Sequence, residues 1–563
     1  MLKPLLCCIV VVLACVNLSA QTTTLKHAIP AGFRNVNPDT NGQPWLVGGM
    51  KMTPEVHARL QQIPEWPGPD AKHSSNTLPD HIYNYKDSAF PATFTQYGSC
   101  CSAASGIGYS YTYECNLLKG VSAKKAANLC AYGFLYDFLD DGVDQGCWYY
   151  DAWDIAKKTG CMSKTDFGGE VEDQGETKWV SGYTAYHNAY SQCRDSSYYT
   201  ISVKDSAGIW KLKQWMYNHG RGDAKGGTAT FSWYSQHNFT TIPTGMPDSG
   251  KKSLIKSIIT AASSQSEHAM TFAGYDDRIG ESSSGALGAV LLQNSWGISY
   301  GDSGRSWVPY RFLKSPASKN ADSTIYENTV YVIEVRKQTV KLDYKVTISH
   351  NSRNKIQIQT GYANSATATS ATNTSYIGGN SSSGSAFNYS GGAYPMEGKG
   401  GDSTIEIGLD VTDFYTAITG TQATFFLMIT SKGGSGSVKN FSLMDYTGDT
   451  VTETACSKTN VTITSNATTT LSIVYTKKTT PIASSARKIS GFDIKVNRDN
   501  SIFVPFGGKS SVAIANMQGR QLKSFETNGQ GWHTMPISIT AGKYVVTIVN
   551  AGKSYSRKID IVK

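Results

Sequence analysis

Hydrophobic and polar residues change their spacing twice along this chain, and each change marks a boundary between predicted regions. Up to about residue 78 the chain is rich in Pro, Gly, Asn and Thr, and only residues 53–60 show a helical pattern. Residues 79–337 carry apolar residues at helical spacing, together with many aromatics and cysteines. From residue 338 short segments of alternating polarity predict strands. The pattern therefore indicates an α+β domain followed by all-β modules, because 563 residues are too many for one core.

The alternating segments fall into two groups on either side of a polar linker at residues 479–487. The first group, residues 338–478, is typical of a β-sandwich, with a low-complexity stretch at 365–392 expected to be a long loop or a hairpin. The second group is residues 488–563. The predicted strands are 341–348, 403–411 and 424–429 in the first group, and 511–516, 541–548 and 558–563 in the second.

The N-terminus carries a basic residue, Lys3, and then an apolar run that ends in small residues before Gln21. This predicts a secretory signal at residues 1–20, with a lipoprotein-like signal ending at Cys15 as the weaker alternative. The run is too short to span a bilayer comfortably and no second one follows, so we expect no stable membrane insertion. Residues 21–78 are interpreted as a leader or propeptide that covers the site until it is removed.

The formal net charge is +9, but the basic residues are scattered and do not alternate with aromatics, which argues against nucleic-acid binding. Three of the 11 cysteines lie in the predicted signal. The remaining eight lack the Cys-x-x-Cys spacing of a zinc site, so no metal and no cofactor is expected. If one of them is a catalytic thiol, an odd number remains, and at least one more is free or paired between chains. The eight are Cys100, Cys101, Cys115, Cys130, Cys147, Cys161, Cys193 and Cys456.

Three short fragments carry candidate chemistry, and their order along the chain matters. The first, residues 96–101, places Cys101 at the head of a predicted helix, the second contains His268, and the third contains Asn294. A thiol attacks only as its thiolate, and a neighbouring imidazole and a helix N-terminus both favour that form. An amide that holds the imidazole completes the order Cys, His, Asn.

These fragments resemble the papain-like cysteine peptidases. The resemblance implies an α+β fold with a helical subdomain and a β-barrel-like subdomain, and a peptide or protein substrate. It further implies that Cys101 is the nucleophile, His268 its base and Asn294 the group that orients the base. Gln96 and the backbone N–H of Cys101 would form the oxyanion hole, and Trp296 would shield the His268–Asn294 hydrogen bond.

The departures from the family pattern leave two questions open. Ser102 replaces the usual aromatic after the nucleophile and one loop residue is missing, so an ungapped alignment on Gln96 would make Ser102 the attacking residue, and Cys100 is a further candidate. The phase of the helix favours Cys101, with one helix face buried and Cys101 at the mouth of the cleft. Bulky aromatics after Gly146 replace the family's glycine wall, so substrate preference does not carry over.

The chain end offers a second resemblance. Residues 542–546 and the closing strand at 558–563 resemble the C-terminal sorting domain of the type IX secretion system. This implies that the secretion machinery is a partner and that the protein reaches the outer surface of a Gram-negative bacterium, or the medium. We expect the protein to be a monomer. Two alternatives to a peptidase stay open: an inactive papain-like scaffold that binds or adheres, and an acyl transferase that uses the same thiol.

Overall fold

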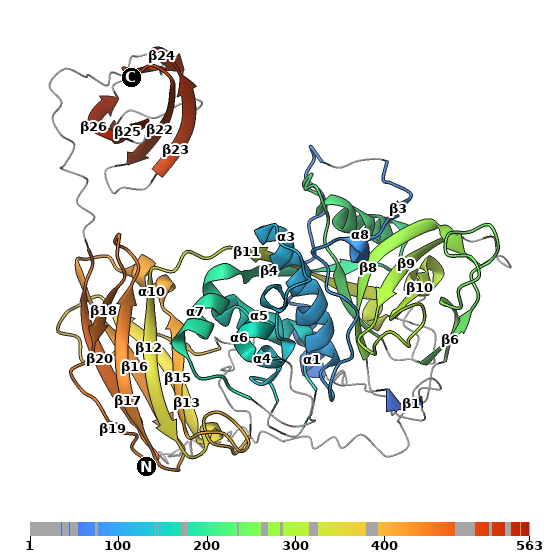
Figure 1. Ribbon diagram of the computed structural model, residues 1–563, viewed down its shortest axis with the longest axis horizontal. Coiled ribbons are helices and arrows are strands. Elements are labelled where there is room, and N and C mark those ends of the chain that lie inside the picture. The colour runs from blue at the N-terminus through green and yellow to red at the C-terminus, as the bar shows by residue number, and fades with distance from the viewer. Residues whose placement is uncertain are drawn as a thin grey trace, which may run out of the picture.

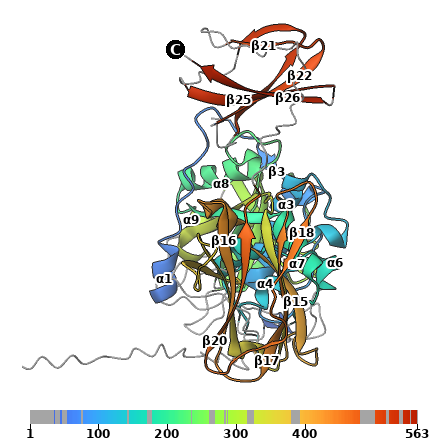
Figure 2. The ribbon, with the colours of Figure 1, turned by 90° about the vertical axis from the view of Figure 1, so that its left-hand side faces the viewer.

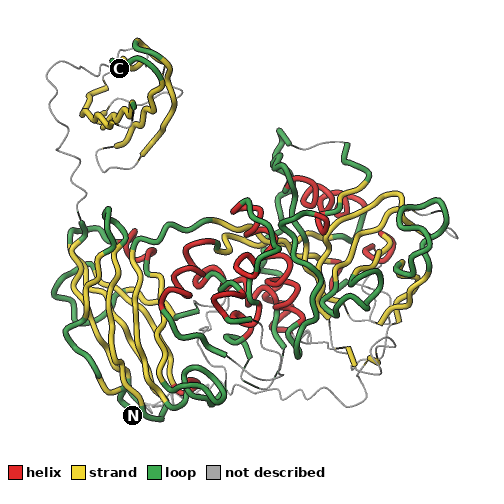
Figure 3. Tube along the Cα trace, in the orientation of Figure 1, coloured by secondary structure: helices red, strands yellow, loops and turns green. Residues whose placement is uncertain are grey.

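The protein combines helices with several β-sheets in a computed structural model that describes residues 35–36, 44–45, 54–73, 77–140, 142, 144, 146–169, 178–233, 236–259, 268–281, 285, 287–314, 325–378, 392–478, 501–516, 521–534, 542–551 and 553–561. The helices gather between two layers of strands (Figure 3). The predicted signal at 1–20, the linker at 479–487 and the turn at 517–520 lie outside the described residues. Within them, no helix is long and apolar enough to cross a membrane.

The helix that starts with the candidate nucleophile runs through the middle of the molecule (Figure 1). It consists of α2 (Cys101–Ala103), a π-helical stretch η2 (Ala104–Tyr111) and α3 (Thr112–Lys119). Every residue from Cys101 to Asn116 is buried, so the expectation of one buried face is wrong. Small residues explain the difference, because a Cβ on Gly106 would stand 2.6 Å from the Cβ of Tyr149 and one on Gly108 would stand 2.7 Å from Phe94. Neighbouring side chains therefore pack against this helix on all sides.

Four further helices form the layer beside this central helix (Figure 1). They are α4 (Tyr132–Tyr136), α5 (Tyr149–Thr159), α6 (Lys164–Phe167) and α7 (Tyr183–Gln192), with short turns at η1 (Asn84–Lys86) and η3 (Ala126–Asn128). The indole of Trp153 on α5 donates to the Gly106 carbonyl at 3.0 Å, which satisfies a carbonyl of the π-helical stretch. A disulfide between Cys115 and Cys193 joins α3 to the residue after α7.

A nine-stranded sheet forms the other side of the predicted catalytic region, residues 79–337, in the order β4-β11-β5-β8-β9-β10-β7-β6 with β3 paired to β8. The described pairs follow an open path from β4 to β6, and most of them are antiparallel. The helices α8 (Ser206–Asn218) and α9 (Tyr310–Lys314) and the turn η4 (Tyr326–Asn328) belong to the same region. The strands are β3 (His81–Ile82), β4 (Arg194–Ser202), β5 (Ala229–Trp233), β6 (Gln236–Thr240), β7 (Leu254–Ile259), β8 (His268–Gly280), β9 (Leu287–Gln293), β10 (Arg305–Pro309) and β11 (Thr329–Arg336).

The described residues between 342 and 476 form two antiparallel sheets around a shared apolar core. One sheet has the order β15-β12-β17-β18 with β19 paired to β17, and the other has the order β14-β13-β16-β20. Strand β20 shows strict alternation of exposed and buried positions, as a half-buried strand requires. The elements are β12 (Leu342–His350), η5 (Arg353–Lys355), β13 (Ile356–Ala363), β14 (Asn373–Tyr376), β15 (Thr404–Asp410), α10 (Thr412–Ala417), β16 (Gln422–Ser431), β17 (Gly436–Asp445), β18 (Thr452–Ala455), β19 (Val461–Thr462) and β20 (Thr468–Thr476).

Helix α7 lies against the edge strand β15 and joins these sheets to the catalytic region (Figures 1 and 2). The Gly182 N–H donates to the Glu406 carbonyl at 2.8 Å, so the chain before α7 covers the edge of the strand. Gly408 permits the close approach, because a Cβ there would stand 2.9 Å from the Tyr190 hydroxyl.

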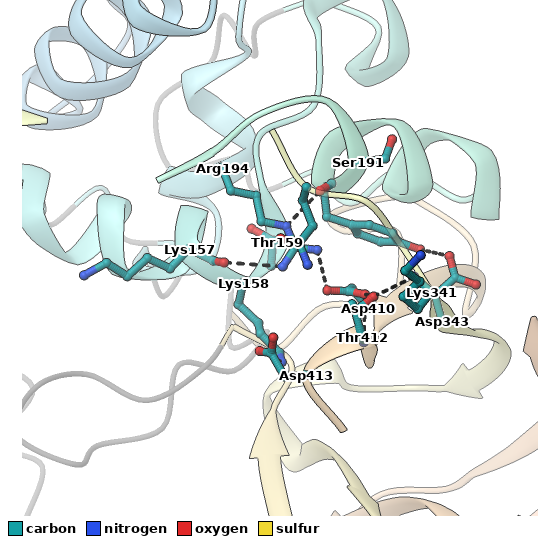
Figure 4. Close-up of polar contacts among 12 residues, drawn as sticks. Lys157, Lys158, Thr159, Ser191, Arg194, Lys341, Asp343, Asp410, Thr412 and Asp413 are labelled. Carbon is teal, nitrogen blue, oxygen red and sulfur yellow. Dashed lines mark hydrogen bonds and ion pairs between the residues drawn. The ribbon is translucent and has the colours of Figure 1, made fainter. Parts of the chain in front are cut away.

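A buried ion pair also joins these sheets to the region before them, because the Arg194 guanidinium donates to the Asp410 carboxylate (Figure 4). Both side chains are 1% exposed or less. Asp410 also accepts from the Thr412 N–H at 3.0 Å. A second buried carboxylate, Asp343, accepts hydrogen bonds of 2.7 Å from the hydroxyls of Tyr183 and Tyr190 on α7. The described part of residues 338–478 is therefore packed onto the predicted catalytic region through satisfied polar contacts.

The C-terminal residues form two small sheets, one of β21 and β24 and one in the order β23-β22-β25-β26. Ile502, Val512, Ile514, Val546 and Ile548 are fully buried between them. The strands expected at 511–516, 541–548 and 558–563 correspond to β22, β25 and β26, with β26 beginning earlier than expected. The bounds are β21 (Ser501–Val504), β22 (Lys509–Asn516), β23 (Gln521–Asn528), β24 (Gly531–Thr534), β25 (Gly542–Asn550) and β26 (Lys553–Ile561).

Residues 54–73 of the predicted leader are built into the body of the protein, after a short antiparallel pair of β1 (Asn35–Val36) and β2 (Pro44–Trp45). The predicted helix is α1 (Pro54–Leu60), and its Arg59 forms ion pairs with Asp151 and Asp154 on α5. Further on, the Trp66 N–H donates to the Thr200 carbonyl at 2.8 Å, beside the edge strand β4. This segment belongs to two apolar cores, with Leu60 in one and Trp66 in the other.

Removing the Trp66 side chain is expected to destabilise the protein by about 3–5 kcal/mol, because a large buried ring leaves a cavity. The indole is 4% exposed and packs edge-on against Trp215 with ring centroids 5.5 Å apart. Urea denaturation of Trp66→Ala would measure the loss. Glu65→Ala, which removes an adjacent side chain that is 58% exposed, should change stability by less than about 0.5 kcal/mol. Equal effects of the two variants would contradict a structural role for this segment.

Candidate active site

Cys101 lies at the first position of α2, where the positive end of the helix dipole favours a thiolate. The backbone N–H of Ala269, at the start of β8, donates to its sulfur at 3.4 Å. The residue before Ala269 is His268, so the strand brings the predicted nucleophile and the predicted base to the same place. Cys101 is 0% exposed, however, and the expectation that it stands open at the mouth of a cleft is not met.

The two other candidate nucleophiles are placed differently. The thiol of Cys100 donates to the Tyr97 carbonyl at 2.6 Å, within its own loop. Ser102 is fully buried, and its hydroxyl makes no hydrogen bond within the described part of the chain. Of the three residues, Cys101 is therefore the one whose reactive atom is shown in contact with the strand that begins at His268.

His268 is held by the amide of Asn294, with 2.9 Å between Nε2 and Oδ1. The same Oδ1 accepts the Ser295 N–H at 2.7 Å, which identifies it as the oxygen of the amide. Nε2 must then carry the proton and donate it, so Nδ1 of the neutral ring is the free acceptor. Trp296 stacks on the imidazole with centroids 4.1 Å apart and an interplanar angle of 12°. The ring is thus fixed in tautomer and orientation and shielded from water.

Burial lowers the pKa of His268 from 6.5 to about 4, although its hydrogen bond with Asn294 acts in the opposite direction. The ring is therefore neutral above about pH 4 and can accept a proton there, and it loses this capacity as the pH falls through that value. We expect the imidazole of His268 to titrate nearer pH 4 than 6.5 in the unprocessed protein, as measured over pH 3–8 by NMR of ¹³C-labelled histidine. Trp296→Ala, which lets water reach the ring, should move this titration upward. A midpoint near 6.5 in the unaltered protein would contradict the effect of burial.

Gln96, the predicted oxyanion donor, is fixed by hydrogen bonds at both ends of its amide. Its oxygen accepts from the Ser295 hydroxyl at 2.5 Å, and its Nε2 donates to the Gly98 carbonyl at 3.1 Å. The Gln96 backbone N–H also donates to the Ser295 carbonyl at 2.8 Å. A primary amide has two N–H donors, so one remains for a substrate oxygen. The loop of Gln96 and the strand end of Asn294 are therefore tied together.

Two residues of this arrangement were not singled out from the sequence. Ser295 links the Gln96 amide to the Asn294 loop, as described above. Tyr109, on the central helix, donates its hydroxyl to the Asn294 carbonyl at 3.1 Å and accepts from Gln293 at 3.2 Å. The available signal was spacing, because Tyr109 is eight residues after Cys101 and so faces the same side of the helix.

The aromatic residues expected in place of a glycine wall turn into the protein instead. Trp148 and Tyr149 are buried and meet edge to face with centroids 6.4 Å apart. Beside them the thiol of Cys147 is fully buried, and this burial, followed by the nearby Cys101, raises its pKa well above the ordinary value. Cys147 is therefore a poor nucleophile despite its position. No group of three or more potential metal ligands occurs among the described residues.

Comparison with known proteins gives likenesses in solved structures only. No protein-family model matches the chain, and no curated protein matches it. Xylellain, a cysteine protease from Xylella fastidiosa, is 15% identical with a TM-score of 0.35, and covers 51% of this chain and 95% of its own. Procathepsin B from Trypanosoma congolense is 10% identical with a TM-score of 0.35, covering 54% and 94%. Bromelain from Ananas comosus, in complex with the E64 inhibitor, is 12% identical with a TM-score of 0.29, covering 46% and 99%.

These similarities concern papain-like cysteine proteases and extend over about half of this chain. At such low TM-scores they define neither its family nor its activity. The chemistry has to be argued from the site itself.

Proposed function

We propose that this protein is a papain-like cysteine peptidase that hydrolyses peptide bonds through an acyl-enzyme on Cys101. One observation carries the proposal. The Cys101 sulfur lies against the main chain of the residue that follows His268, and the imidazole of His268 is locked by Asn294 and Trp296 with Nδ1 left to accept a proton. A structural cysteine does not require an oriented histidine beside it.

In this mechanism the Cys101 thiol gives its proton to Nδ1 of His268, and the thiolate sulfur attacks the carbonyl carbon of the scissile bond. The second N–H of the Gln96 amide and the backbone N–H of Cys101 stabilise the oxyanion that forms. The imidazolium then protonates the departing amine. In the second half, water attacks the thioester after losing a proton to the imidazole, and the thiol is restored when the tetrahedral species collapses.

The burial of the site indicates a latent form. Cys101 is 0% exposed and His268 is 3% exposed, so a peptide reaches the sulfur only after the cover has moved. We propose that part of the leader expected at residues 21–78 must be removed or displaced, whereas residues 54–73 stay, because they pack into the cores of the protein. The removable propeptide would therefore be shorter than the segment of residues 21–78 that was expected.

We also propose that the protein is exported, with residues 1–20 as its signal and residues 488–563 as a sorting domain for type IX secretion. Sequence resemblance supports this part of the proposal. The buried cluster of Ile502, Val512, Ile514, Val546 and Ile548 suits a small independent domain, although Leu522, Trp532 and Val549 on the same sheets are 39%, 49% and 40% exposed.

Labelling with a thiol-directed epoxysuccinyl probe tests the proposal, carried out before and after limited proteolysis of the N-terminus. Mass spectrometry should place the label on Cys101 in the processed protein and show none in the variant His268→Ala. Digestion of a peptide library by the same preparation should produce new termini. Absence of both labelling and cleavage after processing would favour an inactive scaffold, and transfer of the acyl group to an added amine in preference to water would indicate an acyl transferase.

A further inference from the structure

A carboxylate from a distant loop supports the segment that leads into the nucleophile helix. Asp144 accepts the Ser99 N–H at 2.6 Å through Oδ1 and the Ser99 hydroxyl at 3.2 Å through Oδ2. The Tyr136 hydroxyl donates to the same Oδ1 at 3.0 Å. Ser99 is two residues before Cys101, so a fixed Ser99 also fixes the start of α2.

The packing at this point leaves no room for other arrangements. Gly98 has a φ of +48°, and a Cβ there would stand 2.6 Å from Oδ1 of Asp144. Asp144 itself has a φ of +53°, a left-handed conformation that aspartate and asparagine tolerate better than most residues. Its backbone N–H donates to the Asp140 carboxylate at 3.0 Å, which holds the loop in this conformation.

Hydrogen bonds continue from this carboxylate to the candidate base. The Gly98 carbonyl, directly before Ser99, accepts the Gln96 amide at 3.1 Å. The Ser295 hydroxyl donates to the other end of that amide, and Asn294 next to it holds His268. Asp144 therefore sets the position of the carbonyl against which Gln96 is oriented.

We propose that Asp144 is a positioning residue for the oxyanion hole, a role that rests on the proposed peptidase function. By holding Ser99 it places the Gly98 carbonyl, and this carbonyl orients the Gln96 amide so that its free N–H faces the substrate oxygen. It acts through the hydrogen bonds that it accepts. Its charge is not required, because its partners at Ser99 and Tyr136 are neutral groups.

The test compares two substitutions that both suit a positive φ. Asp144→Gly removes the carboxylate without adding backbone strain, and kcat should fall about 10- to 100-fold, as expected when an oxyanion donor is displaced. Asp144→Asn keeps an oxygen for the Ser99 N–H and a donor for the Ser99 hydroxyl, and it should retain kcat within about threefold of the original, in line with a hydrogen-bonding role. Asp248→Gly is the matched control, because Asp248 also has a positive φ of 56° and its carboxylate pairs with the exposed Lys251 and not with a residue of the site.

A second measurement separates positioning from a general loss of structure. Alkylation of Cys101 by iodoacetamide needs the thiolate and its histidine but no oxyanion hole. In Asp144→Gly the alkylation rate and its pH profile should equal those of the original protein, and KM should change by less than about threefold while kcat falls. If alkylation falls in parallel with kcat, or if Asp144→Asn is as damaged as Asp144→Gly, the proposal is overturned.

The outcome for Asp144 stays distinct from the outcome for the peptidase itself. If the original protein, after processing, neither cleaves peptides nor reacts at Cys101, the proposed function fails. If it does both and Asp144→Gly retains the full kcat, only the positioning role fails.

Discussion

Replacing Cys101 with alanine is expected to lower kcat for peptide hydrolysis by about 10⁴-fold or more, because no other group can form the acyl-enzyme. The sulfur is the atom that the strand of His268 contacts, at 3.4 Å from the Ala269 nitrogen. The measurement is the steady-state rate of the processed protein on a fluorogenic peptide, with circular dichroism to verify that the variant is folded.

The neighbouring thiol supplies a closely matched control. Cys100 is equally buried, but its thiol donates to the Tyr97 carbonyl. Cys100→Ala should therefore keep kcat within about tenfold of the original, because it removes a buried sulfur without touching the reacting atoms. If Cys100→Ala abolishes activity and Cys101→Ala does not, the nucleophile has been assigned to the wrong cysteine. If both variants match the original, the activity does not arise from this site.

Breaking the ion pair of Arg194 and Asp410 is expected to cost about 3–5 kcal/mol of stability, the second large effect. Arg194→Met leaves the Asp410 carboxylate buried without its cation, and both side chains are 1% exposed or less. The remaining hydrogen bonds of Asp410, to the N–H and hydroxyl of Thr412, do not neutralise its charge. Urea denaturation, monitored by tryptophan fluorescence, would show that the two joined regions of the variant unfold at a lower urea concentration than those of the original protein.

An exposed ion pair at the same boundary provides the control (Figure 4). Lys158 and Asp413 lie 3.6 Å apart, and the Asp413 side chain is 64% exposed. Asp413→Asn should therefore change stability by less than about 1 kcal/mol, as water screens the pair. Replacing both buried partners, in Arg194→Met with Asp410→Leu, should recover much of the loss because no unpaired charge remains. Equal midpoints for Arg194→Met and Asp413→Asn would show that the boundary carries little of the stability.

The sequence was informative about the site where the chemistry depends on residue type and order. Cys101, His268, Asn294 and Gln96 were all selected from short fragments, and the structure brings them together at one place. Their roles in catalysis remain predictions.

What the sequence did not reveal are the supports, since these depend on partners far away along the chain. Asp144 and Ser99 are separated by 45 residues, and Tyr109 and Asn294 by 185. Aspartate and tyrosine occur in too many places for such pairs to be recognised without the fold. The burial of the central helix on all sides was missed for a related reason, because Gly106 and Gly108 show their purpose only when their neighbours are known.

The boundary between the predicted catalytic region and the β-sandwich could likewise be predicted from residue type, whereas the contacts across it could not. Composition changes near residue 337, and the strands expected at 341–348, 403–411 and 424–429 are present as β12, β15 and β16. The pattern predicts that strands replace helices there, but it does not predict how strongly the β-sandwich is attached to the region before it. Arg194 and Asp410, 216 residues apart, make the attachment.

The covered edge of β15 has a practical meaning for anyone who wishes to shorten this protein. A chain cut at Arg336, near the change in composition, would lose Asp410 and leave the Arg194 guanidinium without its carboxylate partner. It would also remove Asp343 and Gly408, which Tyr183 and Tyr190 of α7 contact. A cut before Pro54 and after Lys478 removes neither contact. A shortened protein that keeps these contacts therefore includes part of the predicted leader and the whole predicted β-sandwich.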